Sequence, residues 1–170
     1  MSDQPAVRPV DSPLTAPPTR AIGVRTWCVV RGAVDAGQLE GFDLVVVCHV
    51  GEAGQTWLGL ESLGRLRAGG TRVVRHVPLA GPATGPEGRD EWFQQALAIV
   101  RTNVGPGWDG CYLDDLADVA AVPGGTEQVI ALIHAAHDAT DGGIVIIQAV
   151  DDPAVTAQAD LVGTQEPLLG

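Results

Sequence analysis

The apolar residues of this chain gather in short, nearly continuous runs. Six such runs lie at residues 24–30, 43–49, 72–77, 110–114, 143–150 and, more weakly, 159–165. They are rich in Val and Ile, which favour strands. A continuous apolar run is typical of a strand in a parallel sheet that is covered on its faces. The pattern therefore predicts six buried, parallel strands.

Segments with helical periodicity separate these runs. The longer ones span residues 56–70, 89–103 and 125–143, and shorter candidates span residues 33–41 and 152–159. Residues 56–70 end on a glycine pair that suits a helix C-cap. Thr126 is expected to cap the start of the third long helix, and Pro153 to stand in the first turn of the last short one.

Strands that alternate with helices predict an α/β fold of right-handed βαβ units. A TIM barrel and an open doubly wound sheet share this periodicity. No G-x-G-x-x-G or P-loop sequence opens any expected helix, which disfavours a nucleotide-binding doubly wound sheet. We therefore expect a (β/α)8-barrel-like parallel sheet, incomplete at about six βα units, over residues 21–170.

The first twenty residues have a different composition. They hold five of the twelve prolines and show neither a helical nor a strand period. This composition predicts an extended arm over residues 1–20, prone to polyproline II structure. Either its own domain or a neighbouring chain is expected to order it.

Charge and hydropathy exclude several classes of function. The net charge is −11, from 21 acids against 10 bases, and every base is Arg. Such an acidic chain is not expected to bind nucleic acid, which requires clustered cations. No apolar run reaches the roughly 20 residues that cross a bilayer, and residues 1–20 do not resemble a secretory signal. We expect no membrane contact, and a location in the cytoplasm or in a particle such as a virion.

Neither a metal site nor a cofactor is expected. His134 and His137 lie one helical turn apart, but no third ligand accompanies them. Cys28, Cys48 and Cys111 lie in separate apolar runs without C-x-x-C spacing. They are expected to be buried, reduced thiols.

One stretch carries candidate chemistry. The sequence "GWDGCYLDD" at residues 107–115 resembles a strand of the endo-α-1,4-polygalactosaminidase family of glycoside hydrolases, with the pattern G-[FW]-D-G, an apolar residue, [FY]-L-D-D. Family-like segments "FDLVVV", "LRAGG", "TRVVRHV" and "RDEW" occur in family-like order, and the resemblance covers most of residues 21–170. It is moderately specific, because similar strands recur in several sugar-cleaving barrels.

The resemblance implies a barrel with an Asp at the end of its fourth strand and a Glu at the end of its sixth. In this chain, Asp114 and Asp115 end the fourth expected strand, and Glu166 follows the sixth. Glycosidic cleavage uses one protonated and one ionised carboxyl group. We expect Asp114 and Glu166 to form the pair, with neither assigned as the acid. Asp115 would orient Asp114 or cap the following turn.

Each candidate also has a structural interpretation. Acids that follow a buried strand often cap a turn, and Glu166 lies near the end of the sequence. His49 and His76 end two expected strands. At these positions they would either contact sugar or be structural histidines with hydrogen-bond partners inside the protein. Trp108 is a candidate for stacking on sugar, whereas Asp109 is expected to make a turn.

Two functions remain open from the sequence. The first is an enzyme that cleaves an amino-sugar-containing polysaccharide with paired carboxylates. The second is a structural or carbohydrate-binding component of a larger assembly, because a barrel has eight strands and typically about 250 residues, whereas Gly170 follows Glu166 by four residues. Other protein chains would then complete the barrel edge and order the arm, and an oligomer is expected.

Overall fold

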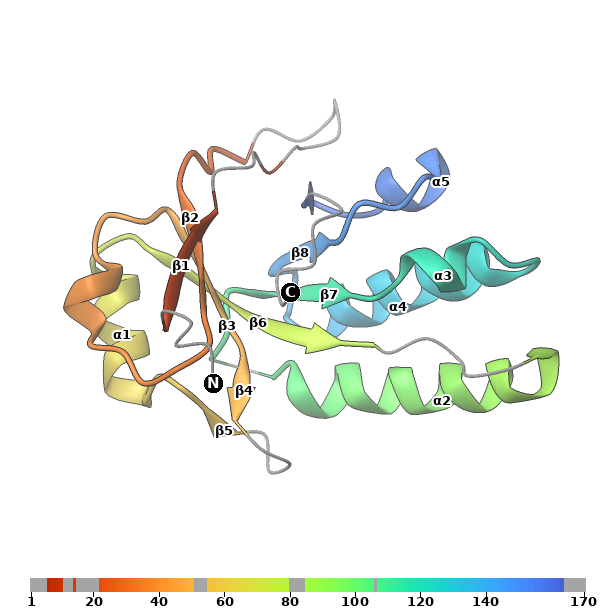
Figure 1. Ribbon diagram of the computed structural model, residues 1–170, viewed down its shortest axis with the longest axis horizontal. Coiled ribbons are helices and arrows are strands. Elements are labelled where there is room, and N and C mark those ends of the chain that lie inside the picture. The colour runs from red at the N-terminus through yellow and green to blue at the C-terminus, as the bar shows by residue number, and fades with distance from the viewer. Residues whose placement is uncertain are drawn as a thin grey trace.

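The structure is a computed structural model that describes residues 6–10, 14, 22–50, 55–79, 85–105 and 107–163. For residues 49–50, 55–56 and 85–87 it gives the course of the backbone only. The described residues form one seven-stranded sheet, a separate two-stranded hairpin and the connecting helices (Figure 1).

The main sheet has the order β1-β2-β3-β6-β7-β8-β9. All strands from β2 onward are parallel, and each lies beside the next one in the chain. Their bounds are Trp27–Val30 for β2, Leu44–Val47 for β3, Arg72–Pro78 for β6, Gly110–Asp114 for β7, Ile144–Ile147 for β8 and Leu161–Val162 for β9.

This strand order identifies the fold. A doubly wound sheet reverses its strand order at a switch point, whereas the order here advances in one direction without reversal. A TIM barrel advances in the same way and closes with eight parallel strands. The described residues supply six parallel strands, so the predicted incomplete (β/α) barrel is confirmed.

Helices fill the connections between the parallel strands. They are the 3₁₀ helix η1 (Ala36–Leu39) and the α-helices α1 (Leu60–Ala68), α2 (Gly85–Asn103), α3 (Ala117–Ala120), α4 (Gly125–Ala139) and α5 (Pro153–Thr156). Leu63 and Leu66 of α1 pack on one half of the outer sheet face. Buried residues of α2 and α4 pack on the other half, and these two helices lie side by side (Figure 1).

None of the helices in the described ranges combines the length and the hydropathy needed to span a lipid bilayer.

The inner face of the sheet carries its own apolar cluster. Alternate residues of the strands meet there: Trp27, Val29, Leu44, Val46, Val74, Tyr112, Ile146 and Leu161. The rings of Trp27 and Tyr112 stack, with centroids 6.2 Å apart and an interplanar angle of 15°. Because parallel strands place their carboxyl ends at one edge, residues just beyond this cluster line the expected mouth of the barrel.

An aspartate precedes every second parallel strand and binds the backbone of the strand before it. Asp43 accepts hydrogen bonds from the N–H groups of Arg25 and Thr26 at 2.8 and 2.9 Å. Asp109 accepts one from Val73 N at 2.8 Å, and Asp160 accepts one from Val145 N at 2.8 Å. These three acids fasten the strands in pairs at the amino edge, opposite the mouth.

Part of the predicted arm joins the sheet. Strand β1 (Val7–Val10) pairs antiparallel with β2, and Arg31 N donates to Ala6 O at 2.9 Å. The chain's own domain therefore orders this part of the arm. Leu14 also packs against the inner cluster, and the other residues of the arm lie outside the described ranges.

The element predictions differ from the structure in detail. The strands are shorter than their apolar runs, as in Trp27–Val30 against residues 24–30. Strand β1, the hairpin of β4 (His49–Val50) and β5 (Gln55–Thr56), and helix α3 were not predicted.

The expected capping role of Thr126 was wrong. The N-cap of α4 is Gly124, with a φ of +78° and no side-chain cap. The hydroxyl of Thr126 instead donates to Asp152 Oδ2 at 2.6 Å, which ties α4 to the cap of α5. A glycine takes the cap position because its backbone adopts the left-handed conformation without a Cβ penalty.

Candidate functional site

Four residues of neighbouring strands lie side by side on the inner face, near the carboxyl edge of the sheet. They are Arg31, Cys48, His76 and Tyr112, and we call them the inner row. The register pairs His76 with Tyr112 across β6 and β7, and it pairs Val47 with Arg75 across β3 and β6. One residue further on, Cys48 is therefore beside His76. Cys48 N donates to Val30 O at 3.0 Å, which continues the register and sets Arg31 beside Cys48.

A buried histidine and aspartate form the centre of the site. His76 Nε2 lies 3.0 Å from Asp114 Oδ2, and the two residues are 2% and 3% exposed. The other carboxylate oxygen, Asp114 Oδ1, accepts a hydrogen bond from Asp115 N at 2.9 Å. Both oxygens of Asp114 are thus held by donors, which fixes its orientation.

The imidazole of His76 is held in its charged form. Burial alone would lower its pKa, but the hydrogen bond to Asp114 and the nearby Cys48 side chain outweigh burial and raise the pKa to about 9. A protonated His76 donates to Asp114, so the pair is an ion pair at neutral pH.

Asp115 differs from Asp114 in exposure and backbone conformation. Its side chain is exposed, and its φ of +62° places it in the left-handed region, which non-glycine residues seldom adopt. Partial burial, Asp114 and Asp118 raise the pKa of Asp115, and the charge of His76 opposes them. Asp115 is thus an accessible carboxyl group whose pKa lies above the ordinary value, and strained backbone of this kind concentrates at functional sites.

The structure brings together three of the predicted site residues, namely His76, Asp114 and Asp115. Glu166 lies outside the described residues, and so does the side chain of His49, whose backbone belongs to β4.

Trp108 lies before β7, at the amino edge. The guanidinium of Arg75 stands 5.8 Å from its ring centroid. The neighbouring Asp109 forms an ion pair with Arg67 at 3.0 Å. Trp108 and Asp109 therefore make contacts with arginines at the amino edge of the sheet, which lies opposite Asp114.

Sequence reasoning missed Arg31 and Cys48 as members of the site. All three cysteines are free and buried, as predicted. The signal that could have found Cys48 is its position as the last apolar residue before His49, because that position places it at the carboxyl end of a strand. Within the described ranges, His, Cys, Asp and Glu side chains form no group of three or more that could hold a metal ion.

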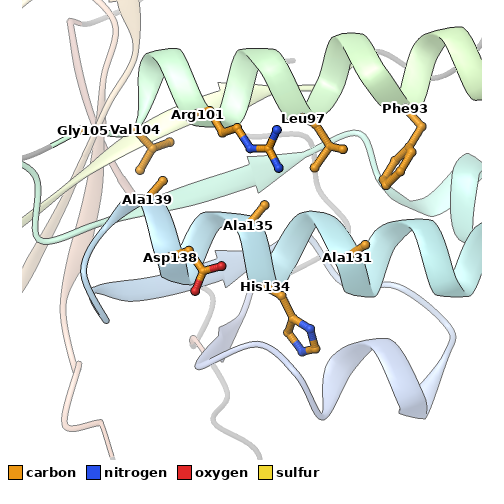
Figure 2. A pocket seen from close by; sticks show the side chains of 10 residues that line it. All are labelled: Phe93, Leu97, Arg101, Val104, Gly105, Ala131, His134, Ala135, Asp138 and Ala139. Atoms are coloured by element: carbon orange, nitrogen blue, oxygen red, sulfur yellow. The ribbon is translucent and has the colours of Figure 1, made fainter.

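A groove lies on the outer surface, away from these residues. It measures about 610 Å³ and lies between α2 and α4. Figure 2 shows its lining: the small side chains of Ala131 and Ala135 of α4 face Phe93 and Leu97 of α2, and Ala139 lies near Val104. Asp138 is the single acid among its lining residues, so the groove offers no carboxylate pair.

The comparisons with known proteins give structural neighbours only. No family model and no curated protein matches the chain. The glycoside hydrolase domain of PelA from Pseudomonas aeruginosa superposes with a TM-score of 0.47 at 16% identity, over 72% of this chain and 58% of that domain. A variant of the same domain gives the same values.

A third neighbour, described as a chitinase A from Streptomyces coelicolor, gives a TM-score of 0.37 at 12% identity, over 69% of this chain and 45% of that one. The chain thus spans less than two thirds of the length of these neighbours. They are similar at low identity, and the fold assignment rests on the strand order of the sheet.

Proposed function

We propose that this chain is a glycoside-hydrolase-like domain that cleaves an amino-sugar-containing polysaccharide with paired carboxylates, as its resemblance to the endo-α-1,4-polygalactosaminidase family suggests. One observation carries the proposal. The carboxyl end of β7 presents two adjacent acids, of which Asp114 is buried and held by His76 while Asp115 is exposed. Carboxylates at this edge face the mouth where barrel enzymes act.

The two acids have different roles in this proposal. Asp115 is the general acid, because it is exposed at the end of β7 and its pKa is raised, as is typical of the acid that assists a leaving oxygen. Asp114 and His76 are positioning residues that hold the end of β7 through the bond to Asp115 N. The exposed side chain of Asp115 reaches the substrate, and the buried Asp114 does not.

Glu166 supplies the second carboxylate. Strand β9 lies two positions from β7 in the sheet, which corresponds to about 9.5 Å between strand axes. Glu166 follows β9 in the sequence, and the two carboxylates of a glycosidase operate at separations of about 5 to 9.5 Å. A separation near the lower limit gives retention of configuration, and one near the upper limit gives inversion.

Charge supports an amino sugar as the substrate. Asp114 and Asp118 act electrostatically on Asp115, and the whole chain carries a net charge of −11. A protein with this net charge attracts a cationic polymer and repels an anionic one. Free amino groups on a partly deacetylated chain provide such cations.

A hydrolysis assay tests this function. The protein is incubated with partly deacetylated polygalactosamine, its fully acetylated form and a neutral glucan, and new reducing ends are counted. We expect cleavage of the first polymer, and a loss of rate of about 100-fold or more in Asp115→Asn and in Glu166→Gln. Asp138→Asn, at the far end of α4, is the matched control and should retain the wild-type rate. Absence of new reducing ends from every polymer would exclude the enzyme.

A second candidate function is a non-catalytic component that binds glycan within a larger assembly. The observation that favours it is the sheet edge, because β9 pairs on one side only among the described residues. Other chains would complete that edge. In affinity electrophoresis, a glycan that slows the migration of the protein but keeps its own chain length would support this candidate over the enzyme.

A further inference from the structure

A cysteine lies between two basic side chains in the inner row. The register sets Cys48 beside Arg31 on one side and His76 on the other. Cys48 acts electrostatically on both groups. Burial lowers the pKa of Arg31 and Cys48 opposes that effect, and Cys48 is one of the two side chains that raise the pKa of His76.

The ring of His76 has one nitrogen that lacks a bonded partner. Nε2 is bonded to Asp114, but Nδ1 is buried and forms no hydrogen bond of standard geometry. The sulfur of Cys48, its neighbour in the row, is close enough to raise the pKa of the ring. A protonated His76 carries a hydrogen on this buried nitrogen, and an imidazolium N–H next to a cysteine stabilises its thiolate form.

The other two cysteines have a different environment. Cys28 and Cys111 lie on the outer face beneath helices, are 0% exposed and have pKa values that burial raises to about 12. Cys48 is 7% exposed at the carboxyl edge. Reactive cysteines occupy partly exposed sites next to cationic groups, whereas structural ones are inert. Cys28 and Cys111 therefore serve as internal controls.

We propose that Cys48 is a nucleophilic thiol, activated by His76 and Asp114, and that small soft electrophiles modify it at the mouth of the barrel. In the reaction with iodoacetamide, Cys48 releases its thiol proton to the solvent, and the protonated His76 stabilises the resulting thiolate through Nδ1–H. The sulfur electron pair forms the S–C bond, and iodide leaves with the electrons of the broken C–I bond. Asp114 stabilises the imidazolium through Nε2. That such a modification also blocks cleavage rests on the proposed function, but the modification itself does not.

Labelling of the folded, full-length protein tests the proposal. The protein is treated with iodoacetamide at pH 7, and the labelled cysteines are identified by peptide mass spectrometry over time. We expect Cys48 to react at least about tenfold faster than Cys28 or Cys111. His76→Gln and Asp114→Asn should each slow the labelling of Cys48 about tenfold, whereas His134→Gln, on the exposed face of α4, should leave it unchanged.

The wild-type protein gives an independent readout, because a variant of the buried pair can fail to fold. Labelling of Cys48 is followed from pH 5 to pH 9, with Tyr112, Asp114 and Asp115 as the other titratable groups that face His76. Fast labelling at pH 6, where an ordinary thiol is almost fully protonated, supports activation. Equal rates for all three cysteines, or a rate that rises only near pH 8.5, would overturn the proposal. Failure of the hydrolysis assay would leave these results unaffected.

Discussion

Adjacent aspartates at the end of β7 have opposite environments. Asp114 points to the inner face, where His76 and Asp115 N hold both of its oxygens. Asp115 follows in a left-handed conformation, which turns its side chain out to solvent. A carboxylate whose oxygens are both engaged has little freedom to exchange protons with a substrate. The geometry therefore favours Asp115 over Asp114 as the group that touches sugar.

The ion pair of His76 makes stability depend on pH. The folded-state pKa of His76 is about 9, above the ordinary value of 6.5. Its contribution to the free energy of unfolding is therefore complete below about pH 6.5 and is lost as the pH rises through about 9. We expect a decrease on the order of 3 kcal/mol across this window, measured by urea unfolding at several pH values.

The matched variants separate His76 from other titrating groups. His76→Gln should be less stable at pH 6 and should show a flatter profile between pH 6.5 and 9. His134→Gln, whose ring bonds Gln158 on the surface, should follow the wild-type profile. A wild-type profile that is level from pH 6 to 9 would contradict the ion pair.

At the scale of elements, the motif that suggested a glycosidase divides into two parts with different functions. Asp109 binds Val73 N and Arg67 at the amino edge. Gly110 makes room for β8, because a Cβ on it would lie 1.9 Å from Ile144 O. The first half of "GWDGCYLDD" thus holds neighbouring strands together at the amino edge. The second half places Asp114 and Asp115 at the carboxyl edge.

This division explains how far the sequence could predict the site. Apolar runs located the six parallel strands, and strand ends located His76 and Asp114, because both follow from local pattern. The row that joins Cys48 to His76 depends on the register between strands that are far apart in sequence, which no local pattern encodes. Strand β1 was missed for the same reason, since its four residues, VRPV, form a strand only by pairing with β2.

The strand-fastening acids give a prediction at the same scale. Asp160 is 6% exposed and accepts from Val145 N. Asp160→Ala leaves that buried N–H without its acceptor, and we expect a loss of about 1–3 kcal/mol in the free energy of unfolding. Asp160→Asn keeps an oxygen that can accept the bond and should lose less. Equal losses in the two variants would show that the hydrogen bond does not carry the effect.

At the scale of the whole molecule, the sheet has two outer edges whose backbone groups must be paired or protected. An exposed strand edge is a template for association with other chains. Strand β1 covers β2 on one edge, and β9, at the other edge, is only two residues long. An antiparallel β1 stands where the eighth strand of a barrel would pair with the first. Strand β1 therefore occupies the position of a barrel strand on this side.

Removal of the arm should expose the edge of β2. We expect a protein that lacks residues 1–20 to associate in solution and to unfold at lower urea, because the N–H and C=O groups of β2 lose their partner. Light scattering gives the mass and urea titration gives the stability. Arg8→Pro is the full-length counterpart, since proline within β1 disrupts pairing, and Arg8→Ala is its control. If both altered proteins keep the mass and stability of the wild type, β1 does not protect the sheet.

A defined wild-type oligomer that dissociates without the arm would instead favour the assembly component over the enzyme, because the arm would then join chains rather than shield an edge.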